Sequence, residues 1–176
     1  RPRIIHTRAV TIDAPAQAVW PWLVQMGQGR GGLYSYDWLE NLLGMDIHSA
    51  DRIVPELQGL QVGDIVSLRR GNVPAFLVHA VEPGRALVLR SRDPRTGRPA
   101  TLQDPSPLAA ETTWAFVLIP KDDASTRLLV RQRVAHKGSL LSGAMWELVE
   151  LLSFVMERKM LLGVRQRAQG ARVPAR

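Results

Sequence analysis

Residues 112–136 read TTWAFVLIPKDDASTRLLVRQRVAH, and this stretch decides the class of fold. Two runs rich in β-branched and aromatic residues, 112–119 and 126–136, flank the polar break Lys121-Asp122-Asp123. Such runs are typical of strands, and such a break is typical of a turn. Because the connection is too short to hold a crossover helix, the two strands are predicted to pair antiparallel.

The same pattern continues toward the N-terminus. Further strands are predicted at 65–69, 75–81 and 85–90, with turn formers such as Glu82-Pro83-Gly84 between them, and the chain opens with a β-branched run at 4–12. Short breaks between consecutive strands predict an antiparallel meander. The one long insert, residues 93–107, holds four prolines and is predicted to be a surface loop.

Helices are predicted at three places. Asp13-Ala14-Pro15 resembles a helix start, after which apolar residues recur at three- and four-residue steps until the glycines that begin at Gly27. Pro21 is expected to kink or split this helix. A second short helix is predicted at 36–43. The last begins near 139 or 142, ends near 167, and carries an apolar stripe of Leu141, Met145, Leu148, Val149, Leu152, Val155, Met156 and Met160.

Composition limits the class of protein. A chain of 176 residues, 45% hydrophobic and 22% charged, fits one domain, predicted at 1–170 with a frayed basic tail at 171–176. The absence of cysteine excludes disulfides, thiolate metal sites and a cysteine nucleophile. The net charge is +7, but no basic run of five occurs and aromatics are not interleaved with the arginines, so no nucleic-acid partner is expected.

Location is predicted from the same composition. The most apolar stretch, 140–163, contains five charged residues, among them a predicted solvated turn at Glu157-Arg158-Lys159, and a lone membrane-spanning helix would not tolerate them. The chain is therefore expected to be cytoplasmic, unless a segment that precedes Arg1 anchors it.

Several motifs, taken with the order of the predicted elements, resemble one superfamily over nearly the whole chain. They are Thr11-Ile12-Asp13-Ala14-Pro15 with Ala18-Val19-Trp20, Glu82-Pro83-Gly84-Arg85, Thr113-Trp114 with Phe116 and Leu118, and Thr126-Arg127-Leu128. The chain resembles the START-like helix-grip superfamily, also called SRPBCC or the polyketide cyclase/dehydrase and lipid-transport group, with the fold of the pollen allergens. The segment 25–41 resembles a bacterial subgroup of it.

The resemblance implies an α+β helix-grip fold. A curved, seven-stranded antiparallel sheet would wrap around the long C-terminal helix, with two short helices after the first strand and an apolar cavity between sheet and helix. This fold hosts both carriers and enzymes, so it does not decide the function. The function predicted is binding or transport of a hydrophobic small molecule, a lipid or a polycyclic, polyketide-like metabolite, with no cofactor.

Two apolar faces support a cavity of this kind. Trp114, Phe116 and Leu118 share one face of a strand by the period of two, and the helix stripe would lie opposite. Core packing alone accounts for the same pattern. The predicted lining residues are Trp38, His79, Arg90, Trp114, Phe116, Leu118, Met145, Leu148, Leu152 and Met156. At the mouth of the cavity we expect Arg30, Tyr34 and Tyr36, next to a glycine loop that would act as a lid.

Two other classes of function stay open. A cyclase or aromatase-like enzyme would use the same cavity, and a buried His79 or Arg90 beside Trp114 would favour it over a carrier. A membrane-surface module would use the arginine-rich tail. The oligomeric state is left open.

Two further motifs are given a structural interpretation. Gly27, Gly29 and Gly32 spell G-x-G-x-x-G, but a helix rather than a strand is predicted before them, which argues against a dinucleotide site. Asp46, His48 and Asp51 offer metal-ligating atoms in a predicted turn with no spacing that fixes a geometry, so no metal site is predicted.

Overall fold

Six antiparallel strands form one open sheet in the computed structural model, which describes residues 4–71, 74–103, 110–136 and 140–170, the last without side chains before residue 151. Their order across the sheet is β1-β6-β5-β4-β3-β2. They are β1 (Ile4–Ile12), β2 (Ile65–Ser67), β3 (Ala75–Glu82), β4 (Ala86–Ser91), β5 (Ala110–Pro120) and β6 (Thr126–His136).

The sequence pattern predicts these strands well. All six predicted runs form strands, and each pairs antiparallel with its neighbours. The resemblance implied a seventh strand, and the described residues form six. The fold class is therefore α+β with an open antiparallel sheet and a long C-terminal helix, as predicted.

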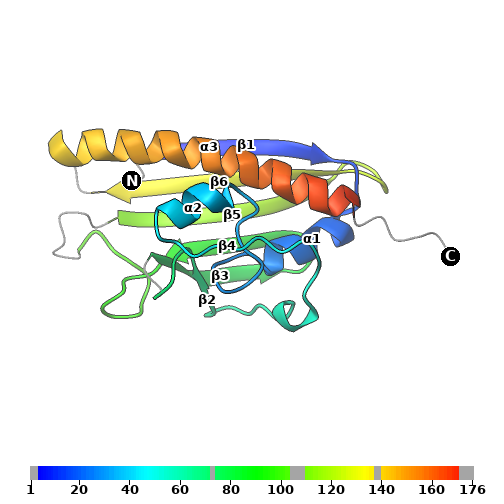
Figure 1. Cartoon of the computed structure of the whole chain (residues 1–176), viewed down its shortest axis with the longest axis horizontal. Coiled ribbons are helices and arrows are strands. Elements are labelled where there is room, and N and C mark those ends of the chain that lie inside the picture. The colour runs from blue at the N-terminus through cyan, green and yellow to red at the C-terminus, as the bar shows by residue number, and fades with distance from the viewer. Residues whose placement is uncertain (1–3, 72–73, 104–109, 137–139, 171–176) are drawn as a thin grey trace.

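The helices are α1 (Ala16–Val24), α2 (Asp37–Leu42) and α3 (Leu140–Gly170), with a single 3₁₀ turn at η1 (Pro55–Leu57). Pro21 lies inside α1, which continues through it as one helix, so the predicted split does not occur. In Figure 1, α3 runs along the sheet beside β1 and meets α1 toward its C-terminal end, while α2 lies over the middle of the sheet.

One face of the sheet forms the core. Trp114, Phe116 and Leu118 alternate along β5 and are all buried, as the period of two predicts. Register places Leu89 of β4 opposite Trp114 and Val130 of β6 opposite Phe116, so apolar side chains of neighbouring strands lie on the same face.

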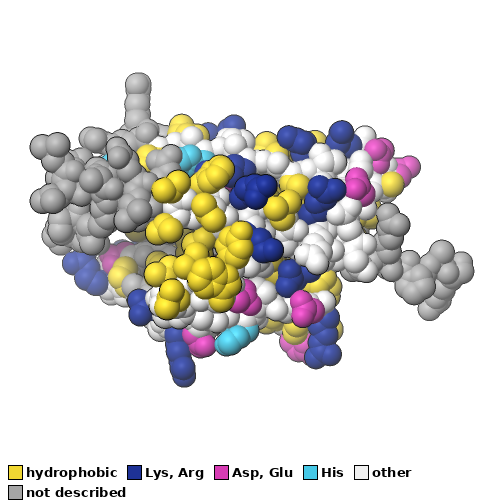
Figure 2. Space-filling model, turned by 45° about the horizontal axis from the view of Figure 1, so that its top comes forward, with side chains coloured by type: hydrophobic (Ala, Val, Ile, Leu, Met, Phe, Trp, Pro, Cys, Tyr) yellow, Lys and Arg dark blue, Asp and Glu magenta, His cyan; other side chains and the backbone are white. Residues whose placement is uncertain are grey.

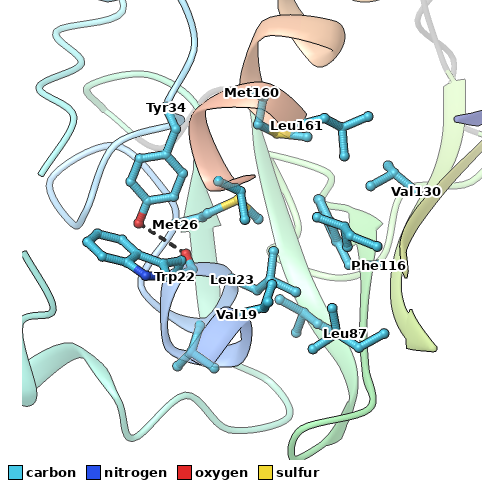
Figure 3. Packing of buried hydrophobic residues seen from close by; sticks show 14 of the residues in the cluster. Val19, Trp22, Leu23, Met26, Tyr34, Leu87, Phe116, Val130, Met160 and Leu161 are labelled. Carbon is cyan, nitrogen blue, oxygen red and sulfur yellow. Dashed lines mark hydrogen bonds between the residues drawn. The ribbon is translucent and has the colours of Figure 1, made fainter. Parts of the chain in front are cut away.

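The helices pack onto this face at one end. Val19 and Leu23 of α1 and Met160 and Leu161 of α3 belong to the same buried cluster as Phe116 (Figure 3). Gly163 of α3 allows a very close approach: a Cβ at this position would lie 2.2 Å from the carbonyl oxygen of Tyr34. Only a residue without a side chain fits there.

The predicted apolar stripe of α3 is only partly buried. Leu152 and Val155 are exposed, at 40% and 41%, whereas every strongly buried position of the described part of α3 lies at or beyond Glu157. The prediction was wrong for the first part of this stripe because periodicity identifies an apolar face but not how far a neighbouring element covers it. The side chains of Leu141, Met145, Leu148 and Val149 lie outside the described residues.

Hydrophobic side chains gather on part of the α3 side of the molecule (Figure 2). The exposed large apolar side chains of α2 and α3 include Trp38, Leu42, Leu151, Leu152 and Phe154. Among the described helices, none combines the length and the apolar sequence needed to cross a membrane.

Candidate functional site

A half-open pocket of about 190 Å³ lies between the inner face of the sheet, the segment around α2 and the middle of α3. Most of its wall is apolar. It is lined by Leu33, Ser35, Glu40, Met45, Leu68, Phe76, Trp114, Gln132, Ser153, Met156, Glu157 and Met160. We refer to this cavity as the pocket.

The rings of Phe76 and Trp114 form one wall of the pocket, and Phe116 supports Trp114 from the core. The ring centroids of Phe76 and Trp114 lie 5.7 Å apart, and those of Trp114 and Phe116 lie 4.8 Å apart, both in tilted contacts. These rings come from β3 and β5, and all three are buried. Rings packed against one another in this way give a rigid apolar surface on which a flat or aliphatic guest can lie.

Glu157 of α3 holds the orientation of Trp114. The indole Nε1–H of Trp114 donates to Oε1 of Glu157 over 3.0 Å, and the guanidinium of Arg8 in β1 forms an ion pair with the other oxygen of the same carboxylate. Glu157 is 7% exposed, so its charge is compensated by these partners rather than by water. The sequence interpretation of Glu157 as part of a solvated turn was wrong.

Glu40 of α2 lies in a different environment. Its side chain is fully buried, and neither carboxylate oxygen has a hydrogen-bond partner among the described residues. Burial raises the pKa of Glu40 to about 7; the nearby charge of Asp37 adds to this rise, and the Ser35 hydroxyl opposes it. A carboxyl group of this kind exists in both protonation states near neutral pH.

The neighbours of Glu40 are engaged elsewhere. Asp37 accepts hydrogen bonds from the backbone N–H and the hydroxyl of Ser49, at 2.7 and 2.6 Å. The hydroxyl of Ser35 donates to the carbonyl oxygen of Met156 over 3.0 Å, which fixes the segment before α2 to α3. The pocket therefore has one compensated carboxylate, Glu157, and one uncompensated carboxylate, Glu40.

Metal binding has no support in the described residues, where no three His, Asp or Glu side chains gather as a metal ion requires. His48 Nε2 lies 3.3 Å from Asp46 Oδ1 at an exposed position. Asp51 is engaged by the guanidinium of Arg167 at 3.1 Å. Asp46 and His48 thus contact each other, while Asp51 has a different partner.

Some of the predicted lining residues lie at the pocket and others do not. Trp114 and Met156 line it. Phe116 and Leu118 share the inner face with Trp114 but are buried in the core, outside the pocket wall. Leu152 is exposed. Met145 and Leu148 fall outside the described side chains.

Three of the predicted polar and aromatic lining residues face elsewhere. His79 is exposed, because it follows the buried Val78 by one residue and so lies on the outer face, at a β-bulge between Val78 and Ala80. Arg90 follows the buried Leu89 by one residue and so lies on the outer face, where it lines a separate groove with Glu111 and Arg133. Trp38 is 68% exposed on α2. Neither His79 nor Arg90 lies beside Trp114.

The predicted mouth residues have different surroundings from those expected. Tyr34 is 1% exposed, and its hydroxyl donates to the carbonyl oxygen of Trp22 over 3.0 Å (Figure 3), so it belongs to the core. Its φ of 57° lies in the left-handed region, which is uncommon for a residue other than glycine. The guanidinium of Arg30 donates to the carbonyl oxygens of Val24, the last residue of α1, and Leu57 at 3.1 and 3.0 Å. Tyr36 is half-buried, with the ammonium of Lys159 5.6 Å from its ring centroid.

The glycine loop at 27–32 is held by its own backbone. Gly27 and Gly32 exchange two N–H···O bonds of 2.9 and 3.0 Å, and the N–H of Gln28 donates to Ser67 of β2. A helix precedes the loop, and the N–H groups of Gly27, Gln28 and Gly32 are paired within the protein, which argues against a dinucleotide fingerprint here.

Sequence reasoning missed both carboxylates of the pocket, and also Phe76, Met45 and Gln132. Glu40 gives no local signal, because α2 has only six residues and its apolar Trp38 and Leu42 are exposed while Glu40 is buried. Phe76 follows the alternation of β3 and could have been assigned to the inner face from its period.

Comparisons with known proteins agree with the fold. A conserved protein of Geobacillus kaustophilus is similar over 96% of this chain and 97% of its own, with 11% identity and a TM-score of 0.54. A protein of Nitrosospira multiformis is similar over 93% of this chain and 94% of its own length, with 15% identity and a TM-score of 0.53. One from Arthrobacter aurescens matches 96% of this chain and 87% of its own, at 13% identity and a TM-score of 0.51.

These similarities concern the fold alone. No family model and no curated protein matches the sequence of the chain.

Proposed function

We propose that this chain binds an apolar small molecule in the pocket and that it belongs to the START-like (SRPBCC) superfamily. The observation that supports the binding proposal best is the pocket itself, in which the rings of Phe76 and Trp114 and the thioethers of Met45, Met156 and Met160 surround a space of about 190 Å³. The superfamily assignment is supported by the sequence motifs together with the sheet and long helix.

The size of the pocket limits the guest. An apolar protein cavity of about 150 Å³ is large enough to bind benzene. A pocket of about 190 Å³ therefore suits one substituted ring or a short aliphatic chain. Methionine side chains at the wall favour recognition of several related shapes, because the thioether chain is unbranched and adaptable.

The binding proposal is tested with toluene, measured by calorimetry against two tryptophan variants of α3. Ser153 lines the pocket, so Ser153→Trp is expected to fill it and to weaken toluene binding at least about tenfold. Leu162 is 38% exposed on the same helix and does not line the pocket, so Leu162→Trp is the matched control. Equal binding by both variants, or no binding by the wild type, would contradict the proposal.

A second candidate function is acid–base catalysis on a small apolar substrate, as in a polyketide cyclase or aromatase. Glu40 favours it, because a buried carboxyl group with a pKa of about 7 is suited to accept or donate a proton near neutral pH. In this case Glu40 would be the acid or base, and the rings of Phe76 and Trp114 would position the substrate.

This candidate is tested with 5-nitrobenzisoxazole, whose ring opens when a base removes its carbon-bound proton. The wild type is expected to accelerate the reaction increasingly as the pH rises through about 7. Glu40→Gln should lower the rate at least about tenfold. Glu56→Gln, which changes an exposed residue of η1, is the control. A rate that is the same in Glu40→Gln would exclude Glu40 as the base.

A further inference from the structure

We propose that the guest of the pocket carries a protonated amine, and that its ammonium group forms an ion pair with the carboxylate of Glu40. This inference rests on the proposed binding function and adds the chemical class of the ligand. The guest is then an apolar body of about one ring with a primary ammonium group at one end.

The first observation is that Glu40 is both fully buried and unpartnered. Neither oxygen has a hydrogen-bond partner among the described residues, since the nearby Ser35 hydroxyl donates to the Met156 carbonyl oxygen, and Glu40 is one of the residues that line the pocket. Leaving a buried charged acceptor unpaired costs free energy, whereas a donor that arrives with a ligand removes this cost. An ammonium group offers three N–H donors and the compensating charge.

The second observation is the charge balance of the pocket. Glu157 is compensated by Arg8, but no described Arg, Lys or His side chain forms an ion pair with Glu40. When Glu40 is ionised, the pocket therefore holds one uncompensated negative charge. This local charge is opposite in sign to the net charge of +7 of the whole chain. The negative charge of the pocket therefore complements a positively charged guest.

The third observation is the aromatic wall. Trp114 and Phe76 line the same pocket as Glu40. The face of an aromatic ring attracts a cation, and the attraction is larger where water is excluded. A carboxylate and aromatic faces in one small pocket together select an ammonium group over an anion or an uncharged polar group.

The number of available ligands favours an ammonium site at Glu40 over a metal-ion site. No group of three acidic or histidine side chains gathers in the described part of the chain. An ammonium group needs one anion and hydrogen-bond acceptors, whereas a divalent metal ion needs several charged ligands. A single free carboxylate therefore suits an ammonium group better.

The pH dependence of binding gives an independent signature. Ion pairing needs the ionised form of Glu40, so amine affinity is expected to rise with pH through the pKa of about 7 and then to level off while the amine stays protonated. The charged groups on the elements around Glu40 are Asp37 on α2, Arg69 after β2, Arg8 on β1, and Glu157 and Lys159 on α3. Asp37 accepts from Ser49, Arg8 forms an ion pair with Glu157, and Arg69 donates to the Gly44 carbonyl oxygen.

The experiment compares benzylamine with benzyl alcohol, two probes of nearly equal size that differ in charge. At about pH 8, benzylamine is expected to bind the wild type at least about tenfold more tightly than benzyl alcohol. In Glu40→Gln the two probes should bind about equally. Glu56→Gln, an exposed change in η1, should keep the wild-type preference.

Each outcome has one meaning. If toluene and benzyl alcohol bind but benzylamine binds no more tightly, the ammonium inference is wrong and the binding proposal stands. If the preference for benzylamine persists in Glu40→Gln, another group holds the ammonium and the assignment to Glu40 is wrong. If none of the three probes binds, the binding proposal fails, and this inference with it.

A measurement on the wild type alone covers the case in which Glu40→Gln does not fold. Benzylamine affinity should increase at least about threefold between about pH 6 and pH 8, while benzyl alcohol affinity should not increase. Parallel pH profiles for the two probes would overturn the inference.

Discussion

Two parts of α3 lie over the same sheet but differ in how deeply their side chains are buried. We call the middle part, residues 151–157, the open end and the C-terminal part the closed end. At the closed end, which comprises Leu161, Gly163, Val164 and Ala168, every one of these residues is buried. At the open end, Leu151, Leu152, Phe154 and Val155 are exposed, and the pocket lies beneath the neighbouring Ser153, Met156 and Glu157. Both ends are rich in apolar residues, so hydrophobicity alone does not decide which end closes.

What lies opposite α3 explains the difference. At the closed end Gly163 lets the helix backbone approach Tyr34, and α1 supplies Val19 and Leu23. At the open end the facing side chains include the carboxylate of Glu40. An unpaired carboxyl group offers an apolar helix face less favourable contacts than apolar side chains do. The open end is therefore less closely packed than the closed end.

The largest contrast is expected between two leucines of α3. Leu161 is 4% exposed at the closed end, and Leu161→Ala should lower the free energy of unfolding by about 2–5 kcal/mol. Leu151 is 61% exposed at the open end, and Leu151→Ala should change the free energy of unfolding by less than about 0.5 kcal/mol. Chemical denaturation measures both. Similar losses for the two variants would mean that the two ends are packed alike.

The contact of Gly163 with Tyr34 gives the next effect. Gly163→Ala should lower the free energy of unfolding by about 3 kcal/mol, because the new Cβ would overlap the Tyr34 carbonyl oxygen and force the helix away from it. Gly59→Ala is the control, since a Cβ there would meet no atom within 4 Å. Thermal unfolding of both variants tests this, and a Gly163→Ala protein as stable as the Gly59→Ala protein would contradict it.

Glu40 makes stability depend on pH. Its pKa rises from 4.5 to about 7 on folding, so the folded chain holds this proton more tightly than the unfolded chain. The stability of the wild type should therefore fall as the pH rises from about 4.5 to 7, and the penalty should be complete above 7. Asp37, also on α2, adds to the shift, and Glu157 with Arg8 forms the nearest compensated pair.

Glu40→Gln removes this ionisation. Relative to the wild type, the variant should become more stable by roughly 1–3 kcal/mol as the pH is raised from about 4 to about 8. Urea denaturation at both pH values measures the change, and Glu56→Gln serves as the control. A stability difference that does not vary with pH would show that Glu40 does not titrate as its burial implies.

The smallest expected effect concerns one hydroxyl at the closed end. Tyr34→Phe removes the buried hydrogen bond to the Trp22 carbonyl oxygen and should cost about 1 kcal/mol of stability. Tyr36→Phe, at a half-buried position before α2, should cost less than about 0.5 kcal/mol. The two variants differ only in which hydroxyl is lost, so equal stabilities would contradict the assignment of Tyr34 to the core.

Sequence reasoning gave the fold more fully than the site, for a physical reason. Strand alternation is set locally, so the run of Trp114, Phe116 and Leu118 could be placed on one buried face. The pocket depends on contacts between distant segments: Glu40, Trp114 and Glu157 come from α2, β5 and α3. No spacing along the chain indicates that these three side chains meet.

The misplaced residues have different reasons. His79 directly follows the buried Val78, so its alternation already indicated the outer face, and the bulge alters the alternation only for the residues after it. Arg90 likewise follows the buried Leu89. Tyr34 was expected at a rim for its amphipathic ring, but its hydroxyl finds a buried backbone partner, which allows it into the core.

The pocket at the open end is the central claim, and methyl NMR tests it most directly. Met45, Met156 and Met160 line the pocket, whereas Met26 is buried in the core outside it. In a titration with toluene of protein labelled with ¹³C at the methionine methyl groups, the first three methyl signals should shift together and saturably, and the Met26 signal should stay in place. Unchanged signals for all four, or equal shifts that include Met26, would contradict a binding pocket between α3 and the sheet.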